Sequence, residues 1–193
     1  MKKNIAVLAS GKGSNAKNIC AFFQKSETVS VKLVCSNKKN SPLESFSKEI
    51  GVNYYFLDNI SPNFFDDFIN HIQSINIDFV VLAGFLLKVP KKLVELYAGN
   101  IINIHPSLLP KYGGKGMYGM NIHNLVIENK EKYSGITIHF VNEEYDSGAI
   151  IFQYKYELKK NETAESLVKE IQKIEHSFFP KIILETIKKT VWE

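Results

Sequence analysis

The stretch IAVLASGKGSNA, residues 5–16, decides the fold class. Its first part, Ile5–Ala9, is a short apolar run with β-branched members, which predicts a buried strand. Serine and two glycines follow at once, so the segment predicts a strand that ends in a tight turn and leads into a helix. A strand followed directly by a helix is typical of the first unit of an α/β fold with a parallel sheet.

The same alternation of strand and helix continues along the chain. Apolar runs predict strands at Ile5–Ala9, Val31–Ser36, Tyr54–Leu57, Phe79–Ala83, Ile101–His105, Ile136–Val141 and Ala149–Tyr156. Capping residues and prolines predict helices that begin at Ser41-Pro42, at Ser61-Pro62 and at Pro90, and a long helix after Asn161 that contains Pro180. We therefore predict a Rossmann-like α/β fold, in which a mostly parallel central sheet has helices on both faces and an antiparallel element in its C-terminal half.

Composition limits the classes of partner. The chain has 193 residues, which at roughly 150 residues per domain predicts a single domain. Its 24 basic residues are all lysine and its 20 acidic residues leave a formal charge of +4. The lysines are interleaved with acids rather than gathered in a stripe, so nucleic-acid binding is not expected. Without arginine, a phosphate has to be bound by lysine or by backbone N–H groups.

The cysteines and the apolar runs predict a soluble protein of the cytoplasm. Cys20 and Cys35 lie in apolar surroundings without CxxC spacing, which is typical of structural thiols in a reducing compartment. The apolar run after Lys2-Lys3 is shorter than the roughly 7–15 residues of a signal-peptide core. The longest apolar run, Phe79–Leu87, is far below the roughly 20 residues needed to cross a bilayer, so no membrane partner is expected.

The loop Ser10–Ala16 has the features of a phosphate site. Glycines let the backbone approach a ligand, and free N–H groups at the start of a helix attract a phosphate. The loop also matches the relaxed dinucleotide pattern GxGxxA, which expects an acidic residue about 20 residues later. The second strand instead leads into Ser36-Asn37-Lys38-Lys39, which argues against NAD and leaves NADP as an alternative. A glycine turn that serves geometry alone is the other alternative.

Three further residues are candidates for catalysis. Asn103 and His105 are two apart on a predicted strand and point to the same face, and Pro106 then turns the chain away. An amide donor next to an imidazole suits a site that holds a carbonyl oxygen as it gains charge while a proton is moved nearby. The alternative is a buried pair in which the two satisfy each other. Asp146, in the triplet Asp146-Ser147-Gly148, is either part of a solvated turn or a third member of such a site.

Metal chemistry is not expected. The chain contains no HExxH motif and no Cys/His ligand spacing, and its five histidines are scattered. It also contains no GxSxG motif, which would indicate a nucleophilic serine. His71 falls on a predicted amphipathic helix and is expected at the surface. His139 alternates within a predicted strand and is expected to be a satisfied core residue rather than a ligand.

Taken together, five segments resemble the folate-dependent phosphoribosylglycinamide formyltransferase family of purine biosynthesis. They are IAVLASGKGSN (5–15), VVLAGF (80–85), INIHPSLLPKYGG (102–114), GITIHFVNEEYDSGAII (135–151) and IQKIEHSFFP (171–180). The resemblance implies the formyltransferase fold, in one domain over residues 1–193. It further implies a phosphate-binding half at residues 1–100 and a catalytic and folate-binding half at residues 101–193.

The resemblance also implies a reaction, in which the amine of 5-phosphoribosylglycinamide attacks the formyl carbon of the co-substrate 10-formyltetrahydrofolate. The implied catalytic residues are Asn103, His105 and Asp146. The implied ribonucleotide-binding residues are Gly13, Ser14, Asn15, Gln172 and Glu175. The implied folate-binding residues are Leu86, Leu87, Lys88, Val89, Asn103, Asn142, Glu143, Glu144 and Tyr145. No metal is expected, and both a monomer and a homodimer are compatible with the sequence.

Two departures from the family pattern concern the folate side. Leu87 stands where many relatives have arginine, so Lys88 is expected to replace it as a less directional partner for the glutamate tail. The segment Gly113–Met120 is longer than the loop often found there.

The alternatives to this function are another formyl transfer or the hydrolysis of formyltetrahydrofolate on the same scaffold, an NADP-dependent oxidoreductase, and a catalytically silent binding module.

Overall fold

The computed structural model describes residues 2–191, so the outer bounds of the predicted domain, residues 1 and 193, lie outside the described residues. The strands are β1 Lys3–Ala9, β2 Val29–Ser36, β3 Asn53–Phe56, β4 Phe79–Leu82, β5 Ile101–His105, β6 Tyr133–Phe140 and β7 Ile150–Glu157. The helices are α1 Ser14–Phe23, α2 Pro42–Ile50, α3 Phe64–Ser74, α4 Lys91–Leu96, α5 Met120–Glu128 and α6 Ala164–Val191. Within this range no helix is both long enough and apolar enough to cross a membrane.

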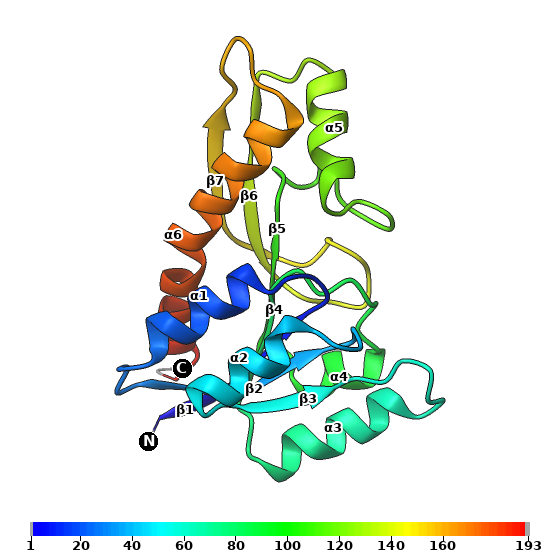
Figure 1. Cartoon of the computed structure of the whole chain (residues 1–193), viewed down its shortest axis with the longest axis vertical. Coiled ribbons are helices and arrows are strands. Elements are labelled where there is room, and N and C mark those ends of the chain that lie inside the picture. The colour runs from blue at the N-terminus through cyan, green and yellow to red at the C-terminus, as the bar shows by residue number, and fades with distance from the viewer. Residues whose placement is uncertain (1, 192–193) are drawn as a thin grey trace.

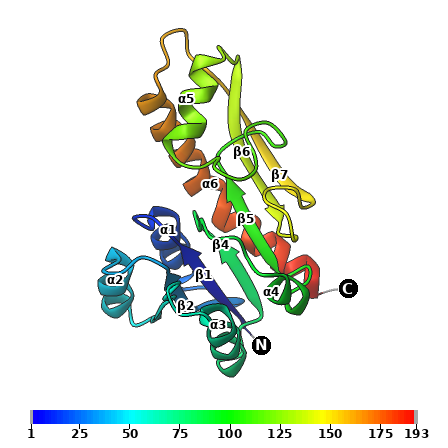
Figure 2. The same cartoon turned by 90° about the vertical axis from the view of Figure 1, so that its right-hand side faces the viewer.

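The strands form one sheet in the order β3-β2-β1-β4-β5-β6-β7. The first five strands are parallel, whereas β6 runs antiparallel to β5 and β7 antiparallel to β6. The predicted sheet, mostly parallel with an antiparallel C-terminal element, is therefore confirmed. The strand order reverses between β1 and β4, which lie side by side in Figure 2. Ligands of open α/β sheets bind beyond the carboxyl ends of the strands at such a reversal.

Helices cover both faces of the sheet because the buried strands are apolar on both sides. On β1, Ile5 and Val7 belong to the core beneath α1 and α6, whereas Ala6 and Leu8 belong to the core beneath α3 and α4. In Figure 1, α6 runs beside β6 and β7 and then reaches α1. This long helix therefore joins the N-terminal strands to the antiparallel part of the sheet.

Most predicted elements appear close to their expected bounds. The helix expected at Ser61-Pro62 begins later, at Phe64, because the Asp58 carboxylate accepts the N–H of Ile60 at 3.2 Å and holds a turn before it. The helix expected at Ser41-Pro42 forms there, with the Ser41 hydroxyl accepting the N–H of Leu43 at 3.3 Å. Helix α6 continues past Pro180, although the proline removes one N–H donor from it.

Helix α5 was not predicted. The sequence around it offers no capping side chain, since the residue before the helix is Gly119 with φ 56°. Its interior contains the β-branched residues Ile122, Val126 and Ile127, which have low helix propensity. The helix is stabilised instead by burial of Ile122 and Val126 in the core shared with α6.

Candidate active site

The predicted site residues gather beyond the carboxyl ends of β1, β4 and β5. The loops after β1 and β4 are joined by two hydrogen bonds. The N–H of Ser10 donates to the Gly84 carbonyl, and the N–H of Leu86 donates to the Ser10 hydroxyl, both at 2.9 Å. The loop that contains the glycines is thereby fixed against the loop expected to bind folate.

Gly13 is a position where only glycine fits. It is the residue before α1, its φ is 75°, and a Cβ atom there would collide with the side chain of Leu43. No side chain caps the helix, and no acidic residue lies in its first turn. The first N–H groups of α1 are therefore free to bind an anion, and the phosphate site expected there stays a prediction.

The predicted ribonucleotide residues of α6 lie against this loop. Gln172 Nε2 donates to the Ser14 hydroxyl at 2.8 Å, and Asn15 Nδ2 donates to Glu175 Oε2 at 2.9 Å. All five predicted residues, including Gly13, line one cavity of about 240 Å³. Burial raises the pKa of the Glu175 carboxyl to about 7, although the hydrogen bond from Asn15 opposes the rise. The cavity does not include Lys38 or Lys39, the residues on which the NADP alternative depended.

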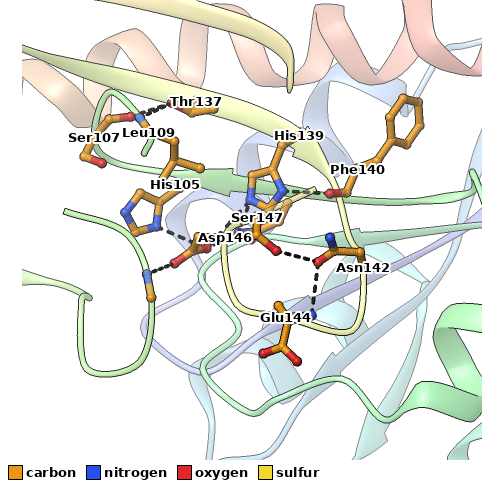
Figure 3. Close-up of polar contacts among 12 residues, drawn as sticks. His105, Ser107, Leu109, Thr137, His139, Phe140, Asn142, Glu144, Asp146 and Ser147 are labelled. Carbon is orange, nitrogen blue, oxygen red and sulfur yellow. Dashed lines mark hydrogen bonds and ion pairs between the residues drawn. The ribbon is translucent and has the colours of Figure 1, made fainter. Parts of the chain in front are cut away.

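Asn103, His105 and Asp146 come together as predicted. Asn103 and His105 lie on β5, and Asp146 enters from the loop between β6 and β7. Asp146 Oδ1 is 3.4 Å from Asn103 Nδ2 and 3.5 Å from His105 Nδ1. The N–H of Gly114 donates to Asp146 Oδ2 at 2.9 Å, so the loop after β5 also holds the carboxylate. Figure 3 shows Asp146 between the rings of His105 and His139.

The two ring nitrogens of His105 face different acceptors. Nε2 donates to the Tyr112 carbonyl at 2.7 Å, which places the proton of the neutral ring on Nε2. Nδ1 then faces the Asp146 carboxylate without a proton. Burial lowers the pKa of His105, and the Asp146 charge and the Tyr112 carbonyl oppose this only in part. Nδ1 is therefore a base at neutral pH, with a carboxylate beside it that stabilises the proton it takes up.

Asp146 is ionised at neutral pH. Burial raises its pKa, but the neighbouring rings of His139 and His105 and the N–H of Gly114 outweigh burial and hold the pKa below its ordinary value. Its φ is 53°, a left-handed conformation that aspartate adopts more readily than most residues. The arrangement is thus a buried carboxylate with an imidazole on either side.

His139 belongs to this cluster, and the sequence did not assign it there. It is buried and satisfied, as predicted, since its Nδ1 donates to the Phe140 carbonyl at 2.8 Å. Its Nε2, however, lies 3.1 Å from Asn103 Nδ2 and 3.7 Å from Asp146 Oδ1. Asn103 and His139 are direct partners in the antiparallel pairing of β5 with β6. That pairing register was the signal that could have identified His139.

Both N–H bonds of the Asn103 amide are directed into the cluster. One is directed to His139 Nε2 at 3.1 Å and the other to Asp146 Oδ1 at 3.4 Å. The contact with Asp146 is the longer and hence the weaker of the two. A substrate oxygen would therefore displace the hydrogen bond to Asp146 more easily than the hydrogen bond to His139.

The predicted folate residues lie around two adjoining cavities. The smaller, of about 60 Å³, is lined by Leu87, Lys88, Val89, Asn103 and residues 142–145. The larger, of about 350 Å³, is lined by Leu86 together with Asn103, His105 and Asp146. The larger cavity has the size of a small-molecule site, roughly 300–1,000 Å³, whereas the smaller is below it.

Ion pairs join the two walls of the smaller cavity. Lys88 Nζ lies 3.6 Å from Glu144 Oε2 and 6.0 Å from the centre of the Tyr145 ring. Lys91 Nζ lies 3.1 Å from Glu143 Oε1. These are exposed pairs, which stabilise a protein by only about 0–1 kcal/mol each, so little energy opposes their separation. In residues 2–191 no group of three or more His, Cys, Asp or Glu side chains is arranged to hold a metal ion.

Comparison with known proteins agrees with this geometry. A family model described as formyl transferase matches residues 3–183. The chloroplastic phosphoribosylglycinamide formyltransferase of Arabidopsis thaliana is 36% identical, and the corresponding protein of Haemophilus influenzae is 35% identical, each over 94% of the chain. The chain spans 64% of the length of the Arabidopsis protein and 85% of the Haemophilus protein.

A solved structure gives the same result for the fold. The crystal structure of phosphoribosylglycinamide formyltransferase from Bacillus halodurans superposes with a TM-score of 0.88 at 32% identity, covering 97% of each chain. The predicted formyltransferase fold is thereby confirmed. The chain belongs to the formyl transferase family.

Proposed function

We propose that the protein transfers the formyl group of 10-formyltetrahydrofolate to the amine of 5-phosphoribosylglycinamide. The products are formylglycinamide ribonucleotide and tetrahydrofolate, and the reaction belongs to purine biosynthesis. The observation that supports this most is the position of Asn103, His105 and Asp146 on a cavity that shares lining residues with the cavity of the phosphate loop. Relatives that share the fold and about a third of the sequence carry the name of this activity.

The ribonucleotide occupies the cavity between α1 and α6 in this proposal. Its phosphate binds the free N–H groups at Gly13–Asn15, a mode that needs no arginine. Its ribose lies near Gln172 and Glu175. Gly84, Ile104 and Pro106 line both this cavity and the larger folate-side cavity. Because these residues line both cavities, the amine of a ribonucleotide in the first cavity can extend toward Asp146 in the second. Residues 1–100 and 101–193 would therefore supply the phosphate-binding half and the catalytic half.

The cluster can perform each step of the transfer. The amine nitrogen attacks the formyl carbon, and Asn103 donates a hydrogen bond to the oxygen as that oxygen gains charge. His105 Nδ1, with Asp146 beside it, takes the proton that the amine loses. As the carbonyl reforms, the bond to the folate nitrogen breaks, and that nitrogen takes up the proton that His105 has accepted from the amine. His139 orients Asn103 throughout.

The folate occupies the larger cavity, and its pterin ring extends toward Leu86–Val89 and Asn142–Tyr145. Entry into the smaller cavity requires the Lys88–Glu144 pair to separate, after which Lys88 is available for the glutamate tail. The reaction needs no metal. Cys20 and Cys35 are buried free thiols, which supports the cytoplasm as the proposed compartment. The functional unit is a monomer or a homodimer.

The test is an absorbance assay that follows the folate product with and without the ribonucleotide. The proposal expects folate product only when 5-phosphoribosylglycinamide is present. Product formed at the same rate without it would indicate a formyltetrahydrofolate deformylase instead. Addition of NADPH should leave the fluorescence of the protein unchanged, and energy transfer to NADPH would favour the oxidoreductase.

A further inference from the structure

The ribonucleotide cavity has a second polar wall, formed by α5, to which the proposed function gives no role. Gly119, which precedes the helix, and His123, one turn further along, both line the cavity that contains Gly11–Asn15. No side chain caps the start of α5. These residues therefore offer the cavity hydrogen-bonding groups in addition to those of the phosphate loop.

His123 is a buried polar side chain, and one of its ring nitrogens has no partner among the described residues. Only 4% of its surface is exposed, and its Nδ1 atom is buried with no hydrogen-bond partner among the described residues. Its neighbours on α5, Ile122 and Val126, pack into the apolar core and offer its ring no polar group. Nearly all buried polar groups in folded proteins are paired, so an unpaired one on a residue that lines a cavity points to a ligand.

A second unpaired atom belongs to Asn15, which lines the same cavity. Asn15 is 8% exposed, and although its Nδ2 donates to Glu175, its Oδ1 atom has no partner in the described chain. An amide oxygen only accepts hydrogen bonds, so it needs a donor from the ligand. An ionised phosphate offers acceptors alone. A sugar hydroxyl both donates and accepts, and it therefore matches Asn15 as well as an imidazole.

The charge state of His123 also favours a hydroxyl over a phosphate. Burial, together with the neighbouring His105, lowers the pKa of its imidazole to about 4. The ring is therefore neutral at pH 7, with one nitrogen that donates and one that accepts. A neutral ring has no charge with which to attract the phosphate, but it has the two functions that a hydroxyl can use.

We infer that His123 recognises the ribose of the substrate by a hydrogen bond to one of its hydroxyl groups. This inference rests on the proposed function, because it assumes that a ribonucleotide occupies the cavity. It makes His123 a specificity-determining residue that distinguishes ribose from deoxyribose. His123 then acts on ribonucleotide binding and leaves folate binding unchanged.

The experiment measures binding of 5-phosphoribosylglycinamide and of analogues that lack one or the other ribose hydroxyl, by calorimetry without folate. The variants are His123→Phe, which keeps a flat ring without nitrogen, and His71→Phe as a matched control on α3, outside the cavity. One of the two analogues lacks the hydroxyl that His123 contacts. Wild type and the control should bind that analogue about tenfold more weakly than the ribonucleotide. His123→Phe should bind the ribonucleotide about tenfold more weakly than wild type and should not distinguish it from that analogue.

Two outcomes overturn the inference while the proposed function stands. His123→Phe could retain wild-type affinity, or it could lose the same factor for every ligand and still distinguish the analogues, as a packing residue would. If wild type fails to bind the ribonucleotide at all, the proposed function itself fails. Should His123→Phe not fold, the imidazole nitrogen resonances of wild type carry the test. Those of His123 should shift with the ribonucleotide and shift less with the analogue, and equal shifts would contradict the inference.

Discussion

The buried carboxyl of Glu175 gives the sharpest energetic prediction. Burial raises its pKa from 4.5 to about 7, so the folded protein holds a proton that the unfolded chain loses at lower pH. For an acid with a raised pKa, the stability it contributes is complete below about pH 4.5 and is lost as pH rises through about 7. The pKa difference of about 2.5, at about 1.36 kcal/mol for each pH unit, corresponds to roughly 3 kcal/mol.

Glu175→Gln removes this ionisation and keeps an oxygen that accepts the hydrogen bond from Asn15. The free energy of unfolding, measured with urea in the absence of ligands, should favour the variant over wild type by about 1 kcal/mol at pH 5 and about 3 kcal/mol at pH 8. Glu185→Gln, at an exposed glutamate on the same helix, controls for the change in net charge. A difference between Glu175→Gln and wild type that stays constant from pH 5 to pH 8 would refute the reasoning.

The remaining predictions concern catalysis and the phosphate loop. His105→Ala and Asp146→Asn should each lower kcat by about two orders of magnitude with the far-ultraviolet circular dichroism unchanged, and near-wild-type rates would mean that these residues are misassigned. Because burial lowers the pKa of His105, the acid fall in the pH profile of kcat/KM should lie below pH 6.5, and a fall centred above that value would contradict the assignment. Gly13→Ala should lower the free energy of unfolding by about 1–3 kcal/mol and raise KM for the ribonucleotide but not for folate, since φ is 75° and Leu43 leaves no room for a Cβ atom.

Local patterns were sufficient to predict the parallel part of the fold and the pair on β5. Alternation along a strand placed Asn103 and His105 on one face, and the bounds Ile101–His105 agree with the structure. The glycines after the first strand likewise predicted a tight turn before a helix, and Gly13 lies in that turn with φ 75°. These features depend on residues close in sequence, so they could be predicted from the sequence alone.

Features that depend on distant residues could not be predicted in this way. Helix α5 is held by its packing on α6 and has no cap of its own. The position of His139 beside Asn103 depends on the register between β5 and β6. The ion pair between Lys88 and Glu144 depends on a loop more than fifty residues away from Lys88. In each case tertiary contacts outweighed a weak or ambiguous local signal.

The most direct test of the central claim is to follow the carbon atom itself. Wild-type protein is incubated with 10-formyltetrahydrofolate that carries an isotope-labelled formyl group and with 5-phosphoribosylglycinamide, and the products are separated and analysed by mass spectrometry. The proposed function predicts the label on the amine nitrogen of the ribonucleotide, in an amount equal to the tetrahydrofolate formed. Label recovered as free formate, with the ribonucleotide unmodified, would contradict it.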